Sequence, residues 1–429
     1  MSLPMLLASL ALTAAPHPAL APLDELYPSL DALYLDLHQH PELSLQERET
    51  AAKLAARLRA LGYEVTTGVG GHGVVGVLRN GPGPTVLLRT DLDALPVKEE
   101  TGLPFASTVT AKTAAGETVP VMHACGHDVH MTAWIGAATL LVRARDRWRG
   151  TLVLVGQPAE ELVSGARAMI GDGLFTRFPK PDFAVAVHQF PMLPAGQVGV
   201  VPGYALAFVD TVELVVHGRG GHGAAPHLTV DPVLLASRIV VALQGIVARE
   251  VDPVDPAVIT VGSIHGGTKS NIIPDEVTLQ LTVRAYKEEV QKQLLKAIGR
   301  LARGEAAASG APREPTVSVA PGGARSVYND PALSARLRLA LERTLGVAAV
   351  TDYHPIMGSE DFSEFGYAGI PSLLLWVGSA APAVFSEARS RGTYPPGNHT
   401  ARMTPDREPT IRTGVATLAL SALELLGRP

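Results

Sequence analysis

The sequence predicts an α/β protein whose main domain is interrupted by a smaller α+β unit. Buried-looking strands alternate with amphipathic helices up to about residue 204, which is typical of a sheet covered by helices. Between residues 205 and 315 the order becomes strand–helix–strand–strand–helix, which indicates a separate single-sheet unit. The first pattern then resumes and continues to the end. We therefore expect a main domain made of residues 24–204 and 316–429, and an inserted domain made of residues 205–315.

Composition limits the classes of function. The chain has 429 residues, of which 46% are hydrophobic and 18% charged, so it can bury the cores of two domains. Its net charge of −5 provides no basic surface for nucleic acid or anionic lipid, and no nucleic-acid-binding motif is present. The single cysteine excludes an intramolecular disulfide framework.

The N-terminus has two interpretations. Residues 1–23 contain no Lys, Arg, Asp or Glu, and Leu3 to Ala15 is an apolar run ending in small residues. That length suits a secretory signal peptide and is too short to span a membrane. The n-region has no positive side chain, and proline follows both Ala15 and Ala21, which favours a disordered arm instead. We favour export to the periplasm or beyond, with a cytoplasmic location as the alternative. No other stretch predicts a membrane span.

Local signals divide the first part of the chain. Leucines at helical spacing predict a helix over residues 24–36. Ser44 and Glu47 have the spacing of a capping box before a second helix, which we expect to end at Gly62. Strands over residues 74–78 and 85–89 follow. Asp128 is then expected to cap another helix.

The remaining elements follow from hydrophobic periodicity. We expect strands over residues 151–156, 182–187, 209–217, 257–264, 276–285 and 372–377. We expect helices over residues 232–249, 288–303, 331–346 and 408–426. Residues 304–315 are rich in Ala, Ser, Gly and Pro and are expected to be flexible.

Titratable side chains follow several of these strands. Asp91 and Asp93 come after one strand, Glu160 and Glu161 after another, and His188 after a third. Because ligands in open α/β sheets bind at the carboxyl ends of the strands, we expect these groups to meet at one edge.

The same part of the chain offers a set of metal ligands. Cys125 and His127 lie two residues apart in a predicted strand-to-helix turn, and a thiolate with an imidazole can bind a transition metal. Glu161, His188 and His399 bring the candidate ligands to five. Five exceed what one four-coordinate zinc with an open position needs, but they suit two ions that share a bridging ligand.

Seven motifs together resemble the M20 metallopeptidase family, specifically its amidohydrolase branch of hippurate hydrolase-like and auxin-conjugate (IAA-amino acid) hydrolase-like enzymes. They run in the family's order and cover the chain from about residue 24 to its C-terminus. They are RTDLDALP (89–96), MHACGHD (122–128), QPAEE (157–161), GGHGAAPH (220–227), SNIIPD (270–275), VR (283–284) and MGSEDF (357–362).

The resemblance implies a zinc-peptidase-like three-layer catalytic domain with a mixed sheet, and a ferredoxin-like lid that forms a homodimer. It implies two divalent metal ions, with Mn²⁺ or Zn²⁺ expected and Ni²⁺ or Co²⁺ compatible. It assigns Glu160 as the general base and Asp93 as the acid that orients a metal ligand. The metal ligands would be Cys125, His127, Glu161, His188 and His399, with the thiolate as the bridge.

On the lid, His222 resembles the histidine that reaches the partner subunit's site and stabilises the oxyanion. Asn271 and Arg284 resemble substrate contacts, and Arg284 is suited to bind a free carboxylate. A turn-capping Asn271 and a structurally paired Arg284 remain the alternatives.

Some positions fit the family pattern less well. Residues 398–403, NHTARM, depart from the usual L-H-[SN]-P followed by an aromatic residue, so His399 has His354 as its alternative. Asp91 occupies the place of a metal-binding histidine in the wider family and is left unassigned. His123, His130 and His227 are expected to be hydrogen-bonding or packing groups.

The function expected is hydrolysis of the amide bond of N-acyl or N-aroyl amino acids by a metal-activated water. A dipeptidase or aminoacylase-type peptidase of the same family is the alternative, and an inactive binding homologue a further one. A thiol hydrolase with Cys125 as nucleophile and His127 as base is a different class. It leaves the other acidic and histidine groups without a role.

Overall fold

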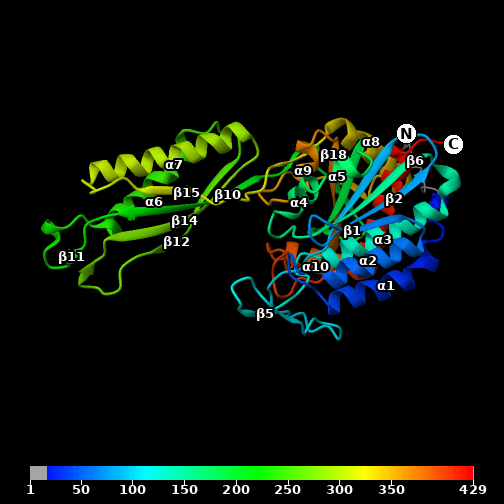
Figure 1. Ribbon diagram of the computed structural model, residues 1–429, viewed down its shortest axis with the longest axis horizontal. Helices are drawn as coiled ribbons and strands as arrows, with labels where there is room; N and C mark the ends of the chain where they lie inside the picture. The colour runs from blue at the N-terminus through cyan, green and yellow to red at the C-terminus, as the bar shows by residue number, and fades with distance from the viewer. Residues whose placement is uncertain (1–16, 429) are drawn as a thin grey trace, which may run out of the picture.

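The computed structural model describes residues 17–428 and has two lobes joined by extended chain segments (Figure 1). The larger lobe contains both ends of the described chain, and the smaller lobe is formed by the middle of the sequence. This arrangement agrees with the expected α/β class and the expected α+β insert.

The larger lobe is built on an eight-stranded mixed sheet. Its strand order is β1-β2-β6-β3-β7-β18-β8-β17. The central strands β6, β3, β7 and β18 run parallel to one another, whereas β1, β2 and β8 introduce antiparallel pairs. The strands are β1 Glu64–Val69, β2 Gly73–Asn80, β3 Thr85–Asp91, β6 Gly150–Gln157, β7 Phe183–Pro194, β8 Val198–Val200, β17 Val350–Asp352 and β18 Ser372–Ala380.

Helices cover both faces of this sheet, so the lobe has three layers. Along β6, Leu152 and Leu154 face one apolar core, and Val153 and Val155 face the other, as the alternation of a strand buried on both sides requires. The first core includes α1 Leu23–Gln39, α2 Arg48–Ala60, α3 His127–Arg143, α8 Pro331–Leu345 and α11 Arg407–Leu425. The second includes α4 Gly165–Gly171, α5 Leu174–Arg177 and α9 Ser363–Tyr367.

The smaller lobe has a four-stranded antiparallel sheet of order β12-β14-β10-β15 with its own apolar core. Its chain order is β10 Phe208–His217, α6 Pro232–Arg249, β12 Ala257–His265, β14 Glu276–Ala285, α7 Glu288–Ala308 and β15 Thr316–Val319. This βαββαβ order on an antiparallel sheet is the expected ferredoxin-like arrangement.

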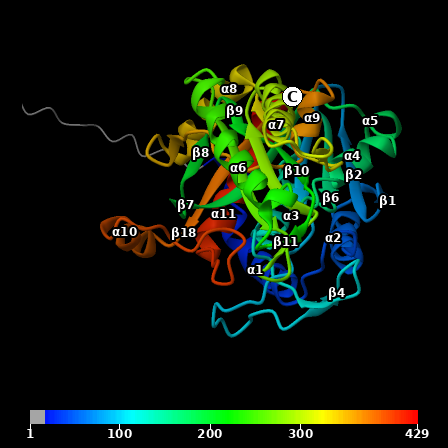
Figure 2. The same ribbon diagram turned by 90° about the vertical axis from the view of Figure 1, so that its left-hand side faces the viewer.

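Short elements complete the described chain. Three two-stranded ribbons pair β4 Thr110–Lys112 with β5 Thr118–Pro120, β9 Gly203–Leu206 with β16 Val327–Asn329, and β11 Gly221–His222 with β13 Ile272–Ile273. Helix α10 Pro382–Ser390 projects from the larger lobe (Figure 2). The 3-10 turns are η1 Pro18–Leu20, η2 Arg145–Arg147 and η3 Pro226–Leu228.

Both predicted N-terminal caps are wrong. Helix α2 begins at Arg48, and the Glu42 carboxylate, rather than Ser44, accepts the backbone N–H groups of Glu49 and Thr50. Helix α3 begins at His127 after a left-handed Gly126, which leaves Asp128 in the first turn, where it binds His38.

Two boundaries near the end of the insert also differ from expectation. Helix α7 continues to Ala308, into the stretch expected to be flexible. Strand β15 pairs with β10, so the smaller sheet extends beyond residue 315. Of the predicted export segment 1–23, residues 1–16 lie outside the described chain, and α1 begins at Leu23.

Candidate metal centre and active site

The five predicted ligands lie together at one edge of the large sheet. Asp93 lies just beyond the end of β3, and Glu161 lies just beyond the end of β6. His188 lies in β7, after Ala186, which is the last residue of β7 that pairs with β3. Cys125 and His127 lie at the start of α3. The expected convergence at the strand ends is therefore observed.

Cys125 is common to two groups of potential ligands. It lies with His127 and His188 in one group and with Glu161 and His399 in the other, and the ligand atoms within each group are within 4.8 Å of one another. The Cys125 Sγ is 3.5 Å from His188 Nε2, and Glu161 Oε1 is 3.4 Å from His399 Nε2. A residue shared between two groups is in the position that a bridging ligand requires.

Hydrogen bonds orient both buried imidazoles toward this cluster. The Nδ1 of His127 donates to the Asp93 carbonyl at 2.8 Å, and the Nδ1 of His188 donates to the Gln189 carbonyl at 2.7 Å. Because a carbonyl oxygen only accepts, the proton of each ring in its neutral form is on Nδ1, and the Nε2 atom faces the cluster. Burial holds the pKa of His188 well below its usual range, so this ring is neutral.

The donor set fits divalent metal ions. Within residues 17–428, two buried atoms of the cluster, His127 Nε2 and Glu161 Oε1, have no hydrogen-bond partner. They are 3.8 Å apart, too far for a hydrogen bond to each other. Thiolate, imidazole and carboxylate ligands suit Zn²⁺ and Mn²⁺, and a cation stabilises this acidic surrounding.

Asp93 holds the segment that carries the two glutamates. Its carboxylate accepts the backbone N–H of Glu160 at 3.2 Å and of Glu161 at 3.0 Å, and the hydroxyl of Ser44 at 2.6 Å. The same carboxylate lies 3.5 Å from His127 Nδ1. The role expected for Asp93, orienting a metal ligand, is compatible with these contacts, which extend to the glutamate backbone.

Gln189 connects the parts of the cluster and was not identified from the sequence. Its side-chain amide donates to the Cys125 carbonyl at 2.8 Å and to Asn398 Oδ1 at 2.6 Å, and its side-chain oxygen accepts from Ser379. It therefore links the cysteine loop to the loop that carries His399. No local sequence signal marks this residue, except that it follows His188.

A buried ionic network lies behind Glu160. Arg89 donates to Asp91 at 2.7 Å, to Glu360 at 2.7 Å and to Asp361 at 3.1 Å. Glu160, Glu360 and Asp361 also form a compact group. Burial, followed by the charges of Glu360 and Glu161, raises the pKa of Glu160 well above its usual range.

Asp91, left unassigned from the sequence, lies next to the cluster, with its Oδ2 3.8 Å from His127 Nε2. Its carboxylate accepts from Nδ1 of His130 at 2.8 Å, and Nε2 of His130 accepts the backbone N–H of Gln189 at 2.7 Å. Because both nitrogens of His130 are used, this histidine is a hydrogen-bonding group, as expected.

His399 and Arg284 border a pocket beside the cluster. This cavity of about 370 Å³ is lined by Cys125, His188, Arg284, Glu360 and His399, together with the apolar residues Phe190, Met192, Leu206, Ile356 and Trp376. His399 is 56% exposed, and its backbone N–H donates to the Ala124 carbonyl. Arg284 donates to the carbonyl of Met357.

Two predicted lid residues lie outside this pocket. His222 is an exposed residue of β11, at the end of the smaller lobe far from the large sheet (Figure 1). Asn271 is exposed beside it, and its carbonyl accepts the backbone N–H of Gly223. The fold of one chain therefore brings Arg284, but neither His222 nor Asn271, to the cluster.

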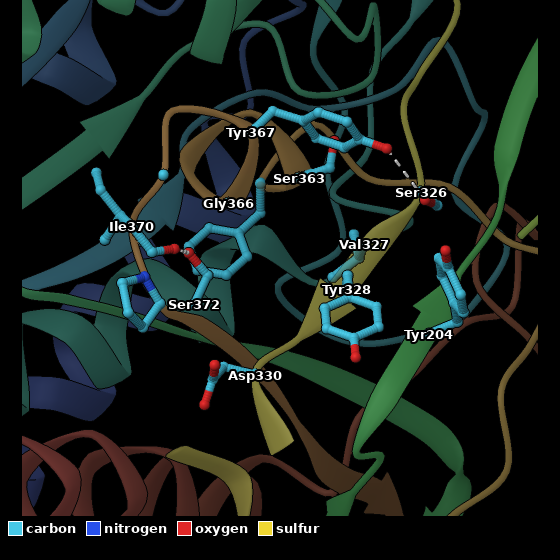
Figure 3. Close-up of a pocket in the computed structure, with 13 residues that line it drawn as sticks. Tyr204, Ser326, Val327, Tyr328, Asp330, Ser363, Gly366, Tyr367, Ile370 and Ser372 are labelled. Atoms are coloured by element: carbon cyan, nitrogen blue, oxygen red, sulfur yellow. Dashed lines mark hydrogen bonds between the residues drawn. The ribbon is translucent and has the colours of Figure 1, made fainter. Parts of the chain in front are cut away.

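The alternative ligand His354 belongs to none of the ligand groups found among the described residues, and lines a different cavity. A further cavity of about 490 Å³ lies between β9, β16 and α9 (Figure 3). Its lining includes Tyr204, Tyr328 and Tyr367 and none of the predicted site residues.

A mixed sheet whose strand ends gather Cys, His and Glu side chains around a buried carboxyl group is typical of a metal-binding hydrolase. The chain belongs to peptidase family M20/M25/M40, whose sequence model matches residues 87–389. It is a hydrolase of this family that acts on amide C–N bonds, and the resemblance inferred from the motifs is confirmed.

Individual relatives cover most of the chain. Thermostable carboxypeptidase 1 of Saccharolobus solfataricus is 36% identical over 392 residues, 90% of this chain and 93% of that protein. Hippurate hydrolase of Campylobacter jejuni is 39% identical over 331 residues, 77% of this chain and 82% of that protein. The crystal structure of Bacillus subtilis YxeP, a dinuclear metal-binding peptidase of the M20 family, superimposes with a TM-score of 0.75 at 30% identity. It covers 94% of this chain and 100% of that one.

Proposed function

We propose that this protein hydrolyses the amide bond of N-acyl or N-aroyl amino acids to a carboxylate and a free amino acid. The observation that carries the proposal is that Glu160 lies beside a two-group cluster of candidate metal ligands. Three of these ligands, Cys125, His188 and His399, line a pocket with apolar walls and one arginine. Cys125, His127, Glu161, His188 and His399 would hold two divalent ions, Mn²⁺ or Zn²⁺ in the first instance and Ni²⁺ or Co²⁺ as alternatives. When bound, such ions supply an activated water and polarise the amide carbonyl.

Glu160 is the proposed general base. Its side chain is buried, lies 3.9 Å from His127 Nε2, and has a raised pKa. A carboxyl group whose pKa is near neutrality can both take a proton from the attacking water and return it to the leaving amine. Asp93 keeps Glu160 and Glu161 in place through their backbone N–H groups.

The pocket supports a substrate with one apolar and one anionic end. Phe190, Leu206 and Trp376 offer apolar surface for an acyl or aroyl group. Arg284, half-buried on the lid side of the same cavity, is the proposed partner of the amino acid's carboxylate. Asn271 is the second proposed substrate contact, from a neighbouring lid.

A thiol hydrolase fits the site less well. Burial, followed by the charges of Glu161 and Glu160, raises the pKa of Cys125 well above its usual range. A nucleophilic cysteine requires the opposite shift. The imidazole within hydrogen-bonding reach of the thiol is that of His188, not of the expected base His127.

Metal analysis combined with a substrate screen tests the proposal. Purified protein should contain up to two divalent ions per chain and should release amino acid from N-acetyl, N-benzoyl or indole-acyl amino acids. EDTA treatment followed by dialysis should abolish the activity, and added Mn²⁺ or Zn²⁺ should restore it. Activity that survives complete metal removal would contradict the metal mechanism. Cleavage of dipeptides alone would favour the dipeptidase alternative, and metal binding without any turnover the inactive binding homologue.

We also propose a homodimer formed through the lid. Among residues 17–428, α6 alone is long and apolar enough to span a membrane by length and composition, and only 33% of it is buried. Its inward face packs in the lid core, while Leu234 and Val241 are 62% and 73% exposed. Because the protein is expected to bind no membrane, a second copy is the proposed cover for this surface, and His222 would then complete the partner's site.

Export remains a prediction from residues 1–23. Expression of the full-length chain followed by N-terminal sequencing of the periplasmic fraction tests it. A mature protein that begins before the start of α1 at Leu23 is expected. A cytoplasmic protein with an intact N-terminus would support the alternative.

A further inference from the structure

A second cavity adjoins the pocket beside the metal cluster. It has a volume of about 640 Å³ and shares Met192 as a wall with the smaller pocket. One loop also borders both: residues 392–395 line the second cavity, and residues 397–399 line the first. The remaining walls are the end of β7, residues 351–354 and helix α10, which stands out from the lobe (Figure 2).

A continuous row of aromatic rings connects the cluster to this second cavity. The ring of His188 lies 5.7 Å from Trp376, which stacks on Phe190 at 4.6 Å between ring centroids. Phe190 contacts Tyr353 edge-on at 5.1 Å, and Tyr353 stacks on His354 at 4.3 Å. The first two rings after His188 line the first pocket, and the last two line the second. A substrate can therefore extend along one aromatic wall from the reacting amide into the second cavity.

The second cavity offers one arginine, Arg389, to an anion. Arg389 of α10 lies over the ring of Phe385 at 5.9 Å and is exposed. Among residues 17–428, Arg389 forms no ion pair, whereas Arg391, two residues later, pairs with Glu387. Asp352, the acidic residue of the cavity, pairs with Arg338. Arg389 is thus left to bind an anion that enters the cavity.

We infer that this second cavity is a distal subsite, which binds an aromatic ring and a carboxylate on the acyl part of an extended substrate. Arg389 selects the carboxylate, and Phe385, Tyr353 and Tyr394 contact the ring. The inference rests on the proposed function, because assigning the amino acid's carboxylate to Arg284 directs the acyl part past Met192. The preferred substrates are then acidic N-acyl peptides with a free C-terminal amino acid, in addition to small N-acyl amino acids.

Three substrates that release the same amino acid test the subsite on the metal-loaded full-length protein. They are the N-acetyl amino acid, the N-succinyl-phenylalanyl amino acid and its neutral N-succinamoyl-phenylalanyl analogue. The wild-type kcat/KM should be about tenfold higher for the succinyl than for the succinamoyl compound, the size of one charge-assisted contact. Arg389→Gln should remove this preference mainly through KM. The control variant Arg391→Gln, which removes an arginine at the end of the same helix but outside the cavity lining, should keep the preference for the succinyl compound.

The outcomes separate the inference from the function on which it rests. If the wild-type protein cleaves the N-acetyl amino acid but treats the two extended compounds alike, the subsite is wrong and the proposed function stands. The same holds if Arg389→Gln retains the succinyl preference. If none of the three compounds is cleaved by protein with a full metal content, the proposed function itself is wrong. Phe385→Leu provides a second measure, since it should lower kcat/KM several-fold for both extended compounds.

Discussion

The Glu160 carboxyl group lies between two sets of acidic side chains. Glu161 belongs to the metal cluster, and Glu360 and Asp361 belong to the network held by Arg89. Burial raises the pKa of Asp361 to about 8. Burial also raises the pKa of Glu160 well above its usual range. The acids behind Glu160 therefore help to keep it protonatable, which a proton-transferring residue needs.

Replacing Glu160 by glutamine tests its role as the base. The change keeps the side-chain shape but removes proton transfer, so kcat/KM should fall about 10²- to 10⁴-fold. The metal content should stay at the wild-type value, because Glu160 is not one of the proposed ligands. Metal analysis and steady-state kinetics on the same preparation measure both. Turnover within a few-fold of wild type would remove Glu160 from the mechanism.

His38 predicts a pH-dependent contribution to stability. Although burial alone lowers its pKa, hydrogen bonds to Asp128 at 2.7 Å and Glu99 at 3.2 Å raise it to about 10. A histidine whose pKa rises on folding stabilises the protein fully below its unfolded pKa of about 6.5, and this stabilisation is lost as pH rises toward 10.

The difference in unfolding free energy between wild type and His38→Gln should therefore be largest near pH 6, on the order of a few kcal/mol, and should shrink by pH 10. Urea denaturation at pH 6, 8 and 9.5 measures it. His40→Gln, at an exposed site two residues away, is the control and should change the unfolding free energy less than His38→Gln does at pH 6. A constant difference for His38→Gln would mean that His38 is neutral in the folded protein.

The turn between the predicted strand end and α3 depends on a glycine. Gly126 has φ of +78°, and a Cβ at this position would lie 2.5 Å from Cγ of Gln189. Gln189 in turn holds the Cys125 carbonyl and Asn398. A side chain at residue 126 would therefore displace the residue that joins the two ligand-bearing loops.

Gly126→Ala should lower both stability and metal affinity. The left-handed backbone costs alanine about 1 kcal/mol, and the contact with Gln189 adds to this. Gly116→Ala is a matched control, because Gly116 has φ of +84° and a Cβ added there would meet nothing within 4 Å. Thermal unfolding and metal titration compare the variants. Equal losses at both positions would show that only the backbone conformation matters.

Elements that depend on a local sequence pattern could be predicted from the sequence. Elements that depend on contacts with distant residues could not. Helix α6 has the bounds predicted for it, since Asp231 caps it before Pro232 and its apolar residues follow helical spacing. Strand β15 was missed, because its four residues are mostly exposed and too few for their polar–apolar alternation to stand out. The capping box at Ser44 failed because Ser44 instead donates to Asp93, a contact across 49 residues.

The site follows the same rule. Glu161 and His188 were located by the strands that precede or contain them, and Cys125 by its spacing from His127. The ion pair between Arg89 and Glu360 spans 271 positions, and no pattern near either residue indicates the other. Such long-range polar partners, with Gln189 among them, become visible only when the folded chain brings them together.

The separation of the two lobes leads to a prediction about the assembly of two copies. His222 lies on the far end of the smaller lobe and is exposed, so it cannot act on the cluster of its own chain in this arrangement (Figure 1). If the lids of two copies associate, each site can combine its own Glu160 with the partner's His222. The variants Glu160→Gln and His222→Ala should then each be nearly inactive alone.

Mixing the two variants, with unfolding and refolding or coexpression to exchange subunits, should recover activity. Random pairing makes about half of the dimers mixed, and each mixed dimer has one complete site of two, so about a quarter of the wild-type activity is expected. The recovered fraction should depend on subunit exchange and should elute as a dimer in size-exclusion chromatography. No recovery from a mixture proven to contain mixed dimers would place His222 outside the shared site.

Because Leu234 and Val241 lie on the lid, away from the metal cluster, Leu234→Glu combined with Val241→Glu offers a separate check of the dimer interface. If α6 forms the interface, this double variant should be monomeric and should lose activity while keeping its metal.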